Sequence, residues 1–174
     1  MKQTLGQNIN FCVGRNVTRQ KISDNIYSLD DFYNDLYGKN GYVDRYNAKC
    51  VVSLTKNKAA VLSPRTENKS LSSIFLLCEM DTDKIDPWYF CYIFNEDKDL
   101  IAQMKRLQQG TIGCMVKLNV SLISSLMIEP PLIERQKIIG KAYREILLLE
   151  RLNREQTENM KIAALETLNR MNEN

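Results

Sequence analysis

The sequence IEPPLIERQKII, at residues 128–139, marks the point at which the chain changes character. Its two consecutive prolines, Pro130 and Pro131, end the preceding structure, because proline lacks a backbone N–H and cannot continue a strand. From residue 132 to 174 there is no proline, and the only glycine is Gly140. The remaining residues are mostly good helix formers, so residues 132–174 are predicted to form one helix roughly 60 Å long.

Apolar side chains recur at helical spacing along this predicted helix and form one stripe. A polar stretch at residues 153–159 divides the stripe, and there the helix could bend, break or set a pairing register. So long a helix cannot bury its stripe against a small domain, so we expect it to pair with another helix. The alternative is that it folds back on its own domain. The stripe consists of Ile138, Ala142, Ile146, Leu149 and Leu152, then Met160, Ala163, Leu165 and Leu168.

Residues 1–131 mix short runs of strand character with short amphipathic segments of helical spacing, which predicts an α+β fold. We expect a globular domain with a small twisted β-sheet and short helices, followed by a long C-terminal dimerisation helix. Helices are predicted at 29–37, after the N-cap Ser28, and at 87–94 and 98–108. Strands are predicted at 3–13, 50–54, 59–62, 73–78 and 121–128, with a further one starting within 43–49.

An acidic cluster at Asp81, Asp83 and Asp86 could hold Mg²⁺ in a nuclease. Asp86 stands directly before Pro87, however, and an acidic N-cap followed by proline is typical of a helix start. We therefore interpret the segment as a loop that enters a helix. The aromatic residues behind this cap are expected in the core rather than stacked on bases; they are Trp88, Tyr89 and Phe90.

The chain contains no histidine, which excludes Ser-His-Asp and Cys-His nucleophiles and histidine zinc sites. No G-x-x-x-x-G-K-[ST] or G-x-G-x-x-G motif occurs, so neither an ATP site nor a dinucleotide site is indicated. The 5 cysteines are scattered without a C-x-x-C pair, which is typical of reduced thiols in a cytoplasm. No secretory signal and no apolar run of membrane length is found, so we expect a cytoplasmic protein without membrane contact.

The charge is small overall and unevenly distributed. The net charge is +3, but residues 1–75 carry 11 Lys and Arg against 6 Asp and Glu. This basic section could lie against phosphates, although solvated surface is the commoner use of such charge.

The junction at residues 128–139 resembles that of specificity (S) subunits of type I restriction–modification enzymes. In that family a strand ends in a double proline and a long helix follows; here Arg135 separates Glu134 from Gln136, which are more often adjacent in the family. The segments at 109–111 and 86–90 are similar to the family's Gly-Thr loop and to the helix before it. Residues 26–37 are similar to some single-domain members.

The resemblance implies that residues 1–131 are a DNA target recognition domain and that residues 132–174 are a spacer helix. S subunits usually carry two such units, whose helices pack antiparallel and hold two recognition domains on a bipartite site. The single unit in this chain implies a homodimer and a palindromic site.

The resemblance also implies that this chain is not an enzyme and holds no metal or cofactor. S-adenosylmethionine, ATP and Mg²⁺ would belong to modification (methyltransferase) and restriction subunits. These subunits and double-stranded DNA are the expected partners.

Three groups of polar and basic residues are candidates for DNA contact, because Lys and Arg bind phosphates and Arg, Asn and Gln read base edges. Ordinary solvated loops are the alternative for each group. The first group is Arg15, Asn16, Thr18, Arg19, Gln20 and Lys21; the second is Lys56, Asn57, Lys58, Arg65, Asn68 and Lys69; the third is Lys105, Arg106, Gln108, Gln109, Thr111 and Lys117.

Two other functions fit the same features. The chain could be a stand-alone DNA-binding dimer that acts as a regulator or decoy, or a coiled-coil module whose domain binds protein. DNA recognition predicts an affinity for duplex DNA that falls steeply with salt, whereas a protein-interaction module does not.

Overall fold

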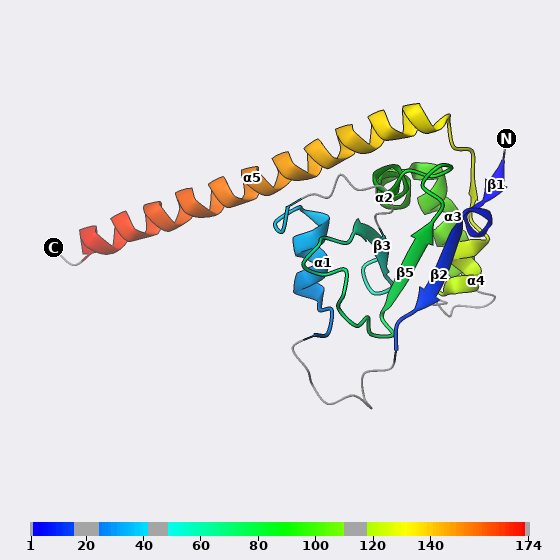
Figure 1. Ribbon diagram of the computed structural model, residues 1–174. Helices are drawn as coiled ribbons and strands as arrows, with labels where there is room; N and C mark the ends of the chain where they lie inside the picture. The colour runs from blue at the N-terminus through cyan, green and yellow to red at the C-terminus, as the bar shows by residue number, and fades with distance from the viewer. Residues whose placement is uncertain (1, 16–24, 42–48, 110–117, 173–174) are drawn as a thin grey trace.

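The computed structural model describes residues 2–15, 25–41, 49–109 and 118–172. In these ranges the chain forms a domain of short strands and helices, from which one long helix extends (Figure 1). The predicted α+β fold class is therefore confirmed.

Two antiparallel sheets lie in the described part of the domain. The larger sheet has the strand order β2-β5-β3-β4, and the smaller one pairs β1 with β6. The smaller sheet thus joins the start of the domain to the segment just before the two prolines. The strands span Gln3–Thr4 (β1), Ile9–Val13 (β2), Cys50–Ser53 (β3), Lys58–Val61 (β4), Phe75–Met80 (β5) and Met127–Ile128 (β6).

Two helices cover opposite faces of the larger sheet. The Cys50 thiol on β3 donates to the carbonyl oxygen of Pro87 in α2 at 3.6 Å, and Cys50 is paired with Cys78 of β5. Phe75 of β5 points to the other face, since side chains alternate along a strand, and its ring packs against Phe32 of α1 at 6.0 Å. The helices are Leu5–Gln7 (η1, a 3-10 turn), Leu29–Leu36 (α1), Pro87–Glu96 (α2), Lys98–Gln108 (α3), Val120–Ser124 (α4) and Ile133–Asn172 (α5).

Helix α2 is the centre of the core, and it is apolar on nearly every side because it lies between the sheet and α5. Its N-cap is Asp86, whose carboxylate accepts a hydrogen bond from the Tyr89 N–H at 2.8 Å. The predicted capping role of Asp86 is therefore confirmed. So is the predicted burial of the three aromatic residues behind it, Trp88, Tyr89 and Phe90.

The structure corrects the strand predicted at residues 3–13. The 3-10 turn at Leu5–Gln7 divides it into β1 and β2, and it buries Leu5 completely. Gly6 in this turn approaches α4 so closely that a Cβ atom there would lie 2.9 Å from the Cβ of Ser124. The contact with α4 therefore bends a segment whose local sequence suits a strand.

The strand predicted at residues 121–128 is also wrong. Its first half is the helix α4, because the Asn119 side chain caps that helix by accepting from the Leu122 N–H at 3.0 Å. Only Met127–Ile128 pairs as a strand. The strand start predicted within 43–49 falls almost wholly outside the described residues.

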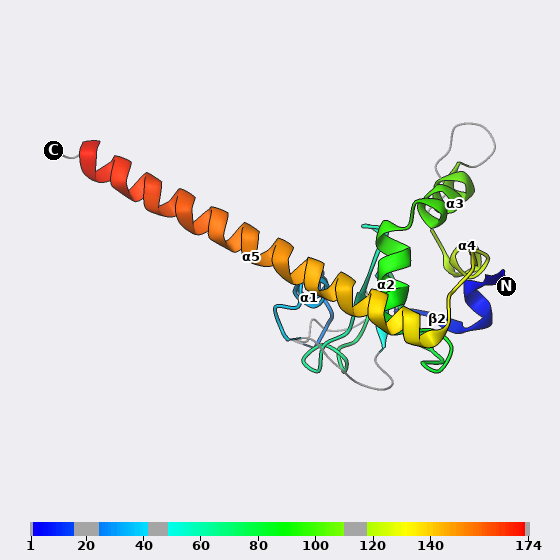
Figure 2. The same cartoon turned by 90° about the horizontal axis from the view of Figure 1, so that it is seen from above.

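The long helix α5 runs without interruption over Ile133–Asn172 (Figures 1 and 2). The polar stretch at residues 153–159 does not break it and instead begins about where the helix leaves the domain. In the described part of the chain, no helix combines the length and the apolar character needed to cross a membrane.

The first half of α5 packs against α2, so the alternative of folding back on its own domain is correct for this half. The buried face consists of Gln136, Gly140, Tyr143 and Leu147. The predicted pairing stripe lies on a different face. All five of its members in this half are exposed: Ile138, Ala142, Ile146, Leu149 and Leu152.

Gly140 permits the close approach of the two helices. A Cβ atom at this position would lie 2.5 Å from the Asp86 Oδ1 atom, 2.8 Å from the Trp88 Cβ atom and 2.8 Å from the Tyr89 nitrogen. These atoms belong to the first turn of α2 and to its cap, and they cannot move without disturbing the cap. The single glycine of the long helix therefore marks its crossing point with α2.

We expect Gly140→Ala to lower the free energy of unfolding by about 1–3 kcal/mol, the usual cost of overpacking. Without the steric conflict, the same change inside a helix would raise it by about 1 kcal/mol. Asn159→Ala, at an exposed position of the same helix, is the matched control and should not destabilise the protein. Urea unfolding of the two variants measures the difference, and equal stability of both would contradict a close crossing at Gly140.

Candidate nucleic-acid interface

One end of the larger sheet gathers two of the basic segments noted in the sequence. Strands β2 and β3 both pair with β5, with Val13 opposite Leu76 and Ser53 opposite Phe75. The end of β2, the start of β5 and the β3–β4 turn therefore lie at the same end of the sheet.

Arg15 and Lys56 are exposed basic residues at this end. Arg15 follows β2, and Lys56 lies in the β3–β4 turn next to Asn57, whose φ of 52° is one that Asn tolerates well. An exposed Arg or Lys near an exposed Asn is a combination suited to contacting both phosphates and bases.

The segment at residues 63–72 lines this region and pairs with two other parts of the chain. The Arg15 N–H donates to the Leu71 carbonyl at 2.8 Å, and the Ser70 N–H donates to the Asn25 carbonyl at 2.8 Å. The Tyr27 N–H donates to the Ser70 carbonyl at 3.0 Å. Segment 63–72 thus fixes the chain directly before and after residues 16–24.

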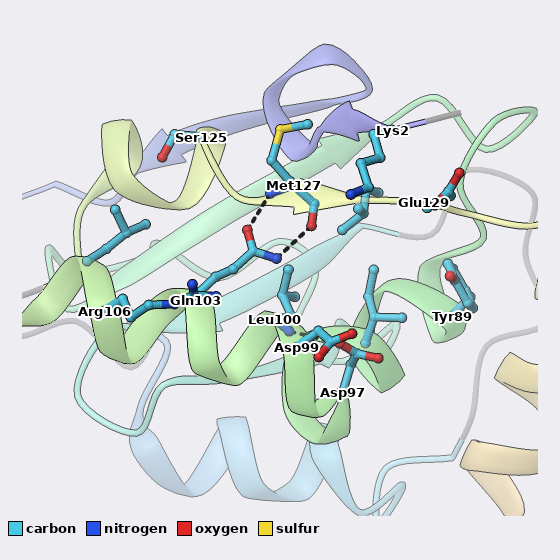
Figure 3. Close-up of a pocket in the computed structure, with 13 residues that line it drawn as sticks. Lys2, Tyr89, Asp97, Asp99, Leu100, Gln103, Arg106, Ser125, Met127 and Glu129 are labelled. Carbon is cyan, nitrogen blue, oxygen red and sulfur yellow. Dashed lines mark hydrogen bonds between the residues drawn. The ribbon is translucent and has the colours of Figure 1, made fainter.

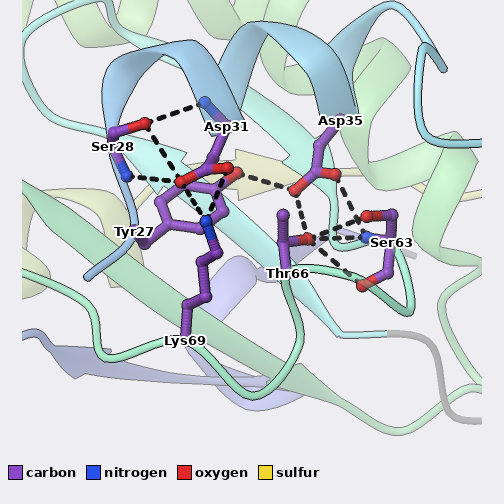
Figure 4. A network of polar contacts seen from close by, with 7 residues as sticks. All are labelled: Tyr27, Ser28, Asp31, Asp35, Ser63, Thr66 and Lys69. Atoms are coloured by element: carbon purple, nitrogen blue, oxygen red, sulfur yellow. Dashed lines mark hydrogen bonds and ion pairs between the residues drawn. The ribbon is translucent and has the colours of Figure 1, made fainter. Parts of the chain in front are cut away.

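The buried carboxylate of Asp35, on α1, holds this segment in place (Figure 4). It accepts hydrogen bonds from the Thr66 hydroxyl at 2.6 Å, the Tyr27 hydroxyl at 2.9 Å and the Ser63 N–H at 3.3 Å. Burial and the nearby Asp35 charge raise the pKa of Tyr27 far above its usual value. Tyr27 therefore stays protonated and remains a donor to Asp35.

A second carboxylate of α1, Asp31, binds Lys69 of the same segment. The Lys69 ammonium lies 2.9 Å from both Asp31 oxygens, and the Ser28 N–H donates to Asp31 at 2.9 Å (Figure 4). Burial works against ionisation of Asp31, but the hydrogen bonds from Lys69 and Ser28 outweigh it and hold the pKa of Asp31 below its usual value. Lys69 is thus engaged within the protein.

Lys58 is engaged in the same way, through an ion pair of 3.2 Å with Glu96 that joins β4 to the end of α2. The basic residues of the second candidate group for DNA contact, at 56–69, therefore differ in their surroundings. Lys56 and Arg65 are exposed in turns, whereas Lys58 and Lys69 hold elements of the domain together.

The third predicted group lies on another surface, at the C-terminal end of α3, which packs against α2 and α4. Lys105 and Arg106 are in the last turn, where a positive charge also stabilises the negative end of the helix dipole. Gln108 and Gln109 end the helix. The structure thus separates this group from the one around Arg15 and Lys56.

A pocket of about 900 Å³ opens between α3 and β6 (Figure 3). The Gln103 side chain crosses to β6, donating to the Met127 carbonyl and accepting from the Met127 N–H, both at 2.9 Å. The charges that line the pocket are mixed, so it is not a uniformly positive surface; they are Lys2, Arg106, Asp97, Asp99 and Glu129.

Asn68 of the second group is exposed in a turn next to Lys69. The other DNA-contact candidates fall outside the residues that the structure describes, and they stay predictions. They are Asn16, Thr18, Arg19, Gln20, Lys21, Thr111 and Lys117.

Gln136 has a role that the sequence did not reveal. Its buried amide accepts from the Asp86 N–H at 3.1 Å and donates to the carbonyls of Lys84 at 3.0 Å and Pro131 at 2.9 Å. One side chain thereby joins the start of α5 to the loop that caps α2. A glutamine flanked by charged residues gives no sign of burial, so only its place in the proline junction could have drawn attention to it.

Asn95 and Tyr143 make a second polar connection between α2 and α5. The Asn95 amide accepts from the Ala59 N–H at 2.7 Å and donates to the Ala59 carbonyl at 2.8 Å and to the Tyr143 hydroxyl at 3.0 Å. It thus joins the edge strand β4, α2 and α5. The domain and the first half of α5 are one packed unit.

No protein-family model matches the chain, and no curated protein matches it in sequence. Several solved structures are similar to it in fold. The crystal structure of the HsdS subunit from Thermoanaerobacter tengcongensis aligns with 94% of this chain at a TM-score of 0.55 and 13% identity. A structure from work on complex assembly and conformational transition of the type I R-M system aligns with 95% of this chain at a TM-score of 0.59 and 14% identity.

At such identities the similarity is one of fold. The aligned part is 39% of the first of these chains and 46% of the second, so this chain spans less than half of either. The shared fold includes both the domain and most of α5, because nearly the whole of this chain is aligned.

The depressed pKa of Asp31 predicts how stability changes with pH. A carboxylate whose pKa is lower in the folded state stabilises the fold above its unfolded pKa, and the contribution is lost as the pH falls through the folded pKa. We therefore expect Asp31→Asn to lower the melting temperature at pH 7, with the difference from the wild type shrinking below about pH 4. Lys69→Met should reduce the pH dependence similarly, and a difference that persists at pH 2 would contradict this assignment.

Proposed function

We propose that this chain is a sequence-specific DNA-recognition subunit of the kind found in type I restriction–modification systems. The observation that carries the proposal is the fold shared with an HsdS subunit and with a structure of the type I R-M system, over 94% and 95% of this chain. The proline junction at residues 128–139 favours the same family on independent grounds. The role is binding, and residues 1–131 would read the DNA.

In this proposal the chemistry resides in partner subunits. A modification subunit with S-adenosylmethionine would methylate the site, and a restriction subunit with ATP and Mg²⁺ would cleave. This chain would direct both to the DNA in the cytoplasm, without a cofactor or metal of its own.

The exposed end of the sheet, with Arg15, Lys56 and the neighbouring segment 63–72, is the surface that we propose for DNA contact. Its basic side chains are exposed, and hydrogen bonds to α1 hold the segment beneath them. The end of α3 would form a second contact, through Lys105 and Arg106.

We further propose that α5 pairs with α5 of a second copy, so that two recognition domains face the two halves of a palindromic bipartite site. The support is a stripe of large apolar residues, one every 11 residues, on the face turned away from α2: Ile138, Leu149, Met160 and Met171. Their exposed fractions are 70%, 59%, 66% and 72%.

An 11-residue repeat closely matches the turn of an undistorted helix, so the stripe stays on one side of a nearly straight rod. It extends the stripe predicted from sequence and passes through the polar stretch at Asn153. A polar residue in the centre of an apolar seam favours one register over others. An antiparallel pair would bring the two Asn153 side chains near each other.

We expect Leu149→Lys combined with Leu152→Lys to convert the dimer to a monomer, because four lysines in one helix seam repel each other and cannot be desolvated. Asn159→Lys combined with Asn169→Lys, off the stripe on the same helix, is the control and should leave the dimer intact. Sedimentation at several concentrations measures both. A dimer that survives the leucine changes would rule out this seam.

The test of function is co-expression with a modification subunit, followed by mapping of methylated adenines. We expect methylation at one bipartite palindromic motif that depends on this chain and is lost with Arg15→Ala and Lys56→Ala together. An asymmetric motif would exclude the homodimer but keep DNA recognition. Salt-dependent binding of duplex DNA without any methylation would favour a regulator or decoy, and no DNA binding at all would refute the proposal.

A further inference from the structure

Helix α5 touches the domain at a second place, beyond its contact with α2. The Arg151 guanidinium donates through Nη1 to the Gly38 carbonyl at 2.9 Å, and the Arg154 guanidinium lies 4.8 Å from the centroid of the Tyr37 ring. Both partners are at the C-terminal end of α1. Figures 1 and 2 both place α1 beside the middle of α5.

The electrostatics of α1 explain why two arginines gather there. The first turn of α1 carries Asp30 and Asp31, and its last turn carries no basic residue. The carbonyl end of a helix is its negative pole, which a nearby cation stabilises. Arg151 and Arg154 of α5 supply the charge that α1 lacks, and Gly38, at a φ of 64°, turns the chain at this end.

The contact with α2 supports α5 as far as Leu147, and the contact with α1 holds the helix again farther along, at Arg151 and Arg154. The contact with α2 begins at Gln136 and that with α1 ends at Arg154, roughly 27 Å farther along the helix at its usual rise. All described residues after Arg154 are exposed. We call residues 155–172 the arm; its direction depends on both contacts.

Helix α1 is also the element that holds the candidate DNA surface. Asp31 binds Lys69, and Asp35 binds Thr66, both in segment 63–72. The same eight-residue helix therefore contacts segment 63–72 through its carboxylates and the long helix through its C-terminal end. Movement of the arm relative to α1 would change its orientation relative to the DNA surface.

We propose that Arg151 and Arg154 are positioning residues that lock the arm at one angle to the recognition surface and thereby set the spacing between two half-sites. This rests on the proposed function, in which two arms pair. Each added base pair turns one half-site by roughly 34° about the DNA axis, since a turn of DNA takes about 10.5 base pairs. A dimer with locked arms cannot follow that rotation, whereas one with free arms can.

The full-length wild-type protein first selects duplexes from a random pool. The selected duplexes are then synthesised again with the spacer between the half-sites one or two base pairs longer or shorter. We expect the wild type to bind the selected spacer about tenfold more tightly than its neighbours, a penalty like that of one mismatched base pair. In the double variant Arg151→Ala, Arg154→Ala this preference should fall to about twofold or less, while affinity for a single half-site is unchanged. Lys161→Ala, in the arm and off the stripe, is the matched control and should keep the wild-type preference.

Sedimentation and melting temperature confirm that each variant is folded and dimeric, so a loss of spacer preference cannot come from a lost dimer. If the alanine variant does not fold, Arg151→Lys with Arg154→Lys replaces it, because lysine keeps the charges but not the planar guanidinium contacts. If a folded variant keeps the wild-type spacer preference, Arg151 and Arg154 do not set the angle of the arm. If the wild type selects no duplex, the proposed function is wrong, and the role proposed for Arg151 and Arg154 is wrong with it.

Discussion

The packing of α5 against α2 is the contact on which the rest of the architecture depends. It requires a position without a side chain, Gly140, and a buried amide, Gln136, that satisfies three backbone groups at once. A buried polar group stabilises a fold only when its hydrogen bonds are complete, and here the loop before α2 and the proline junction complete them. The long helix is consequently part of the domain for its first half and separate from it only afterwards.

That division gives α5 two faces with different surroundings. One face is covered by α2, while the opposite face keeps large apolar side chains in solvent along the whole rod. Exposed apolar residues are common on proteins, but a regular line of them on a helix is typical of a surface that pairs. The proposed pairing and the observed packing on α2 are thus compatible, because pairing would use a face that α2 leaves exposed.

Ion pairs between elements of the domain distinguish the basic residues that have an acidic partner from those that are exposed in turns. Lys58 and Lys69 look equivalent to Lys56 and Arg65 in the sequence, yet the first two are bound to Glu96 and Asp31. Their acidic partners are 38 residues away along the chain, so no local pattern could identify them. The same holds for Arg151 and Arg154, whose neighbours at the end of α1 are brought near only by the fold.

Local signals were enough to place α1, α2, α3 and the full extent of α5, because caps, prolines and apolar spacing act within a few residues. They were also enough to identify the stripe and the family-like junction. They failed at residues 3–13 and 121–128, where the contact between Gly6 and Ser124 and the cap at Asn119 override strand character. The roles of Gln136 and Gly140, and the separation of bound from exposed lysines, were decided by tertiary contacts alone, since each depends on atoms that are distant in sequence and adjacent in space.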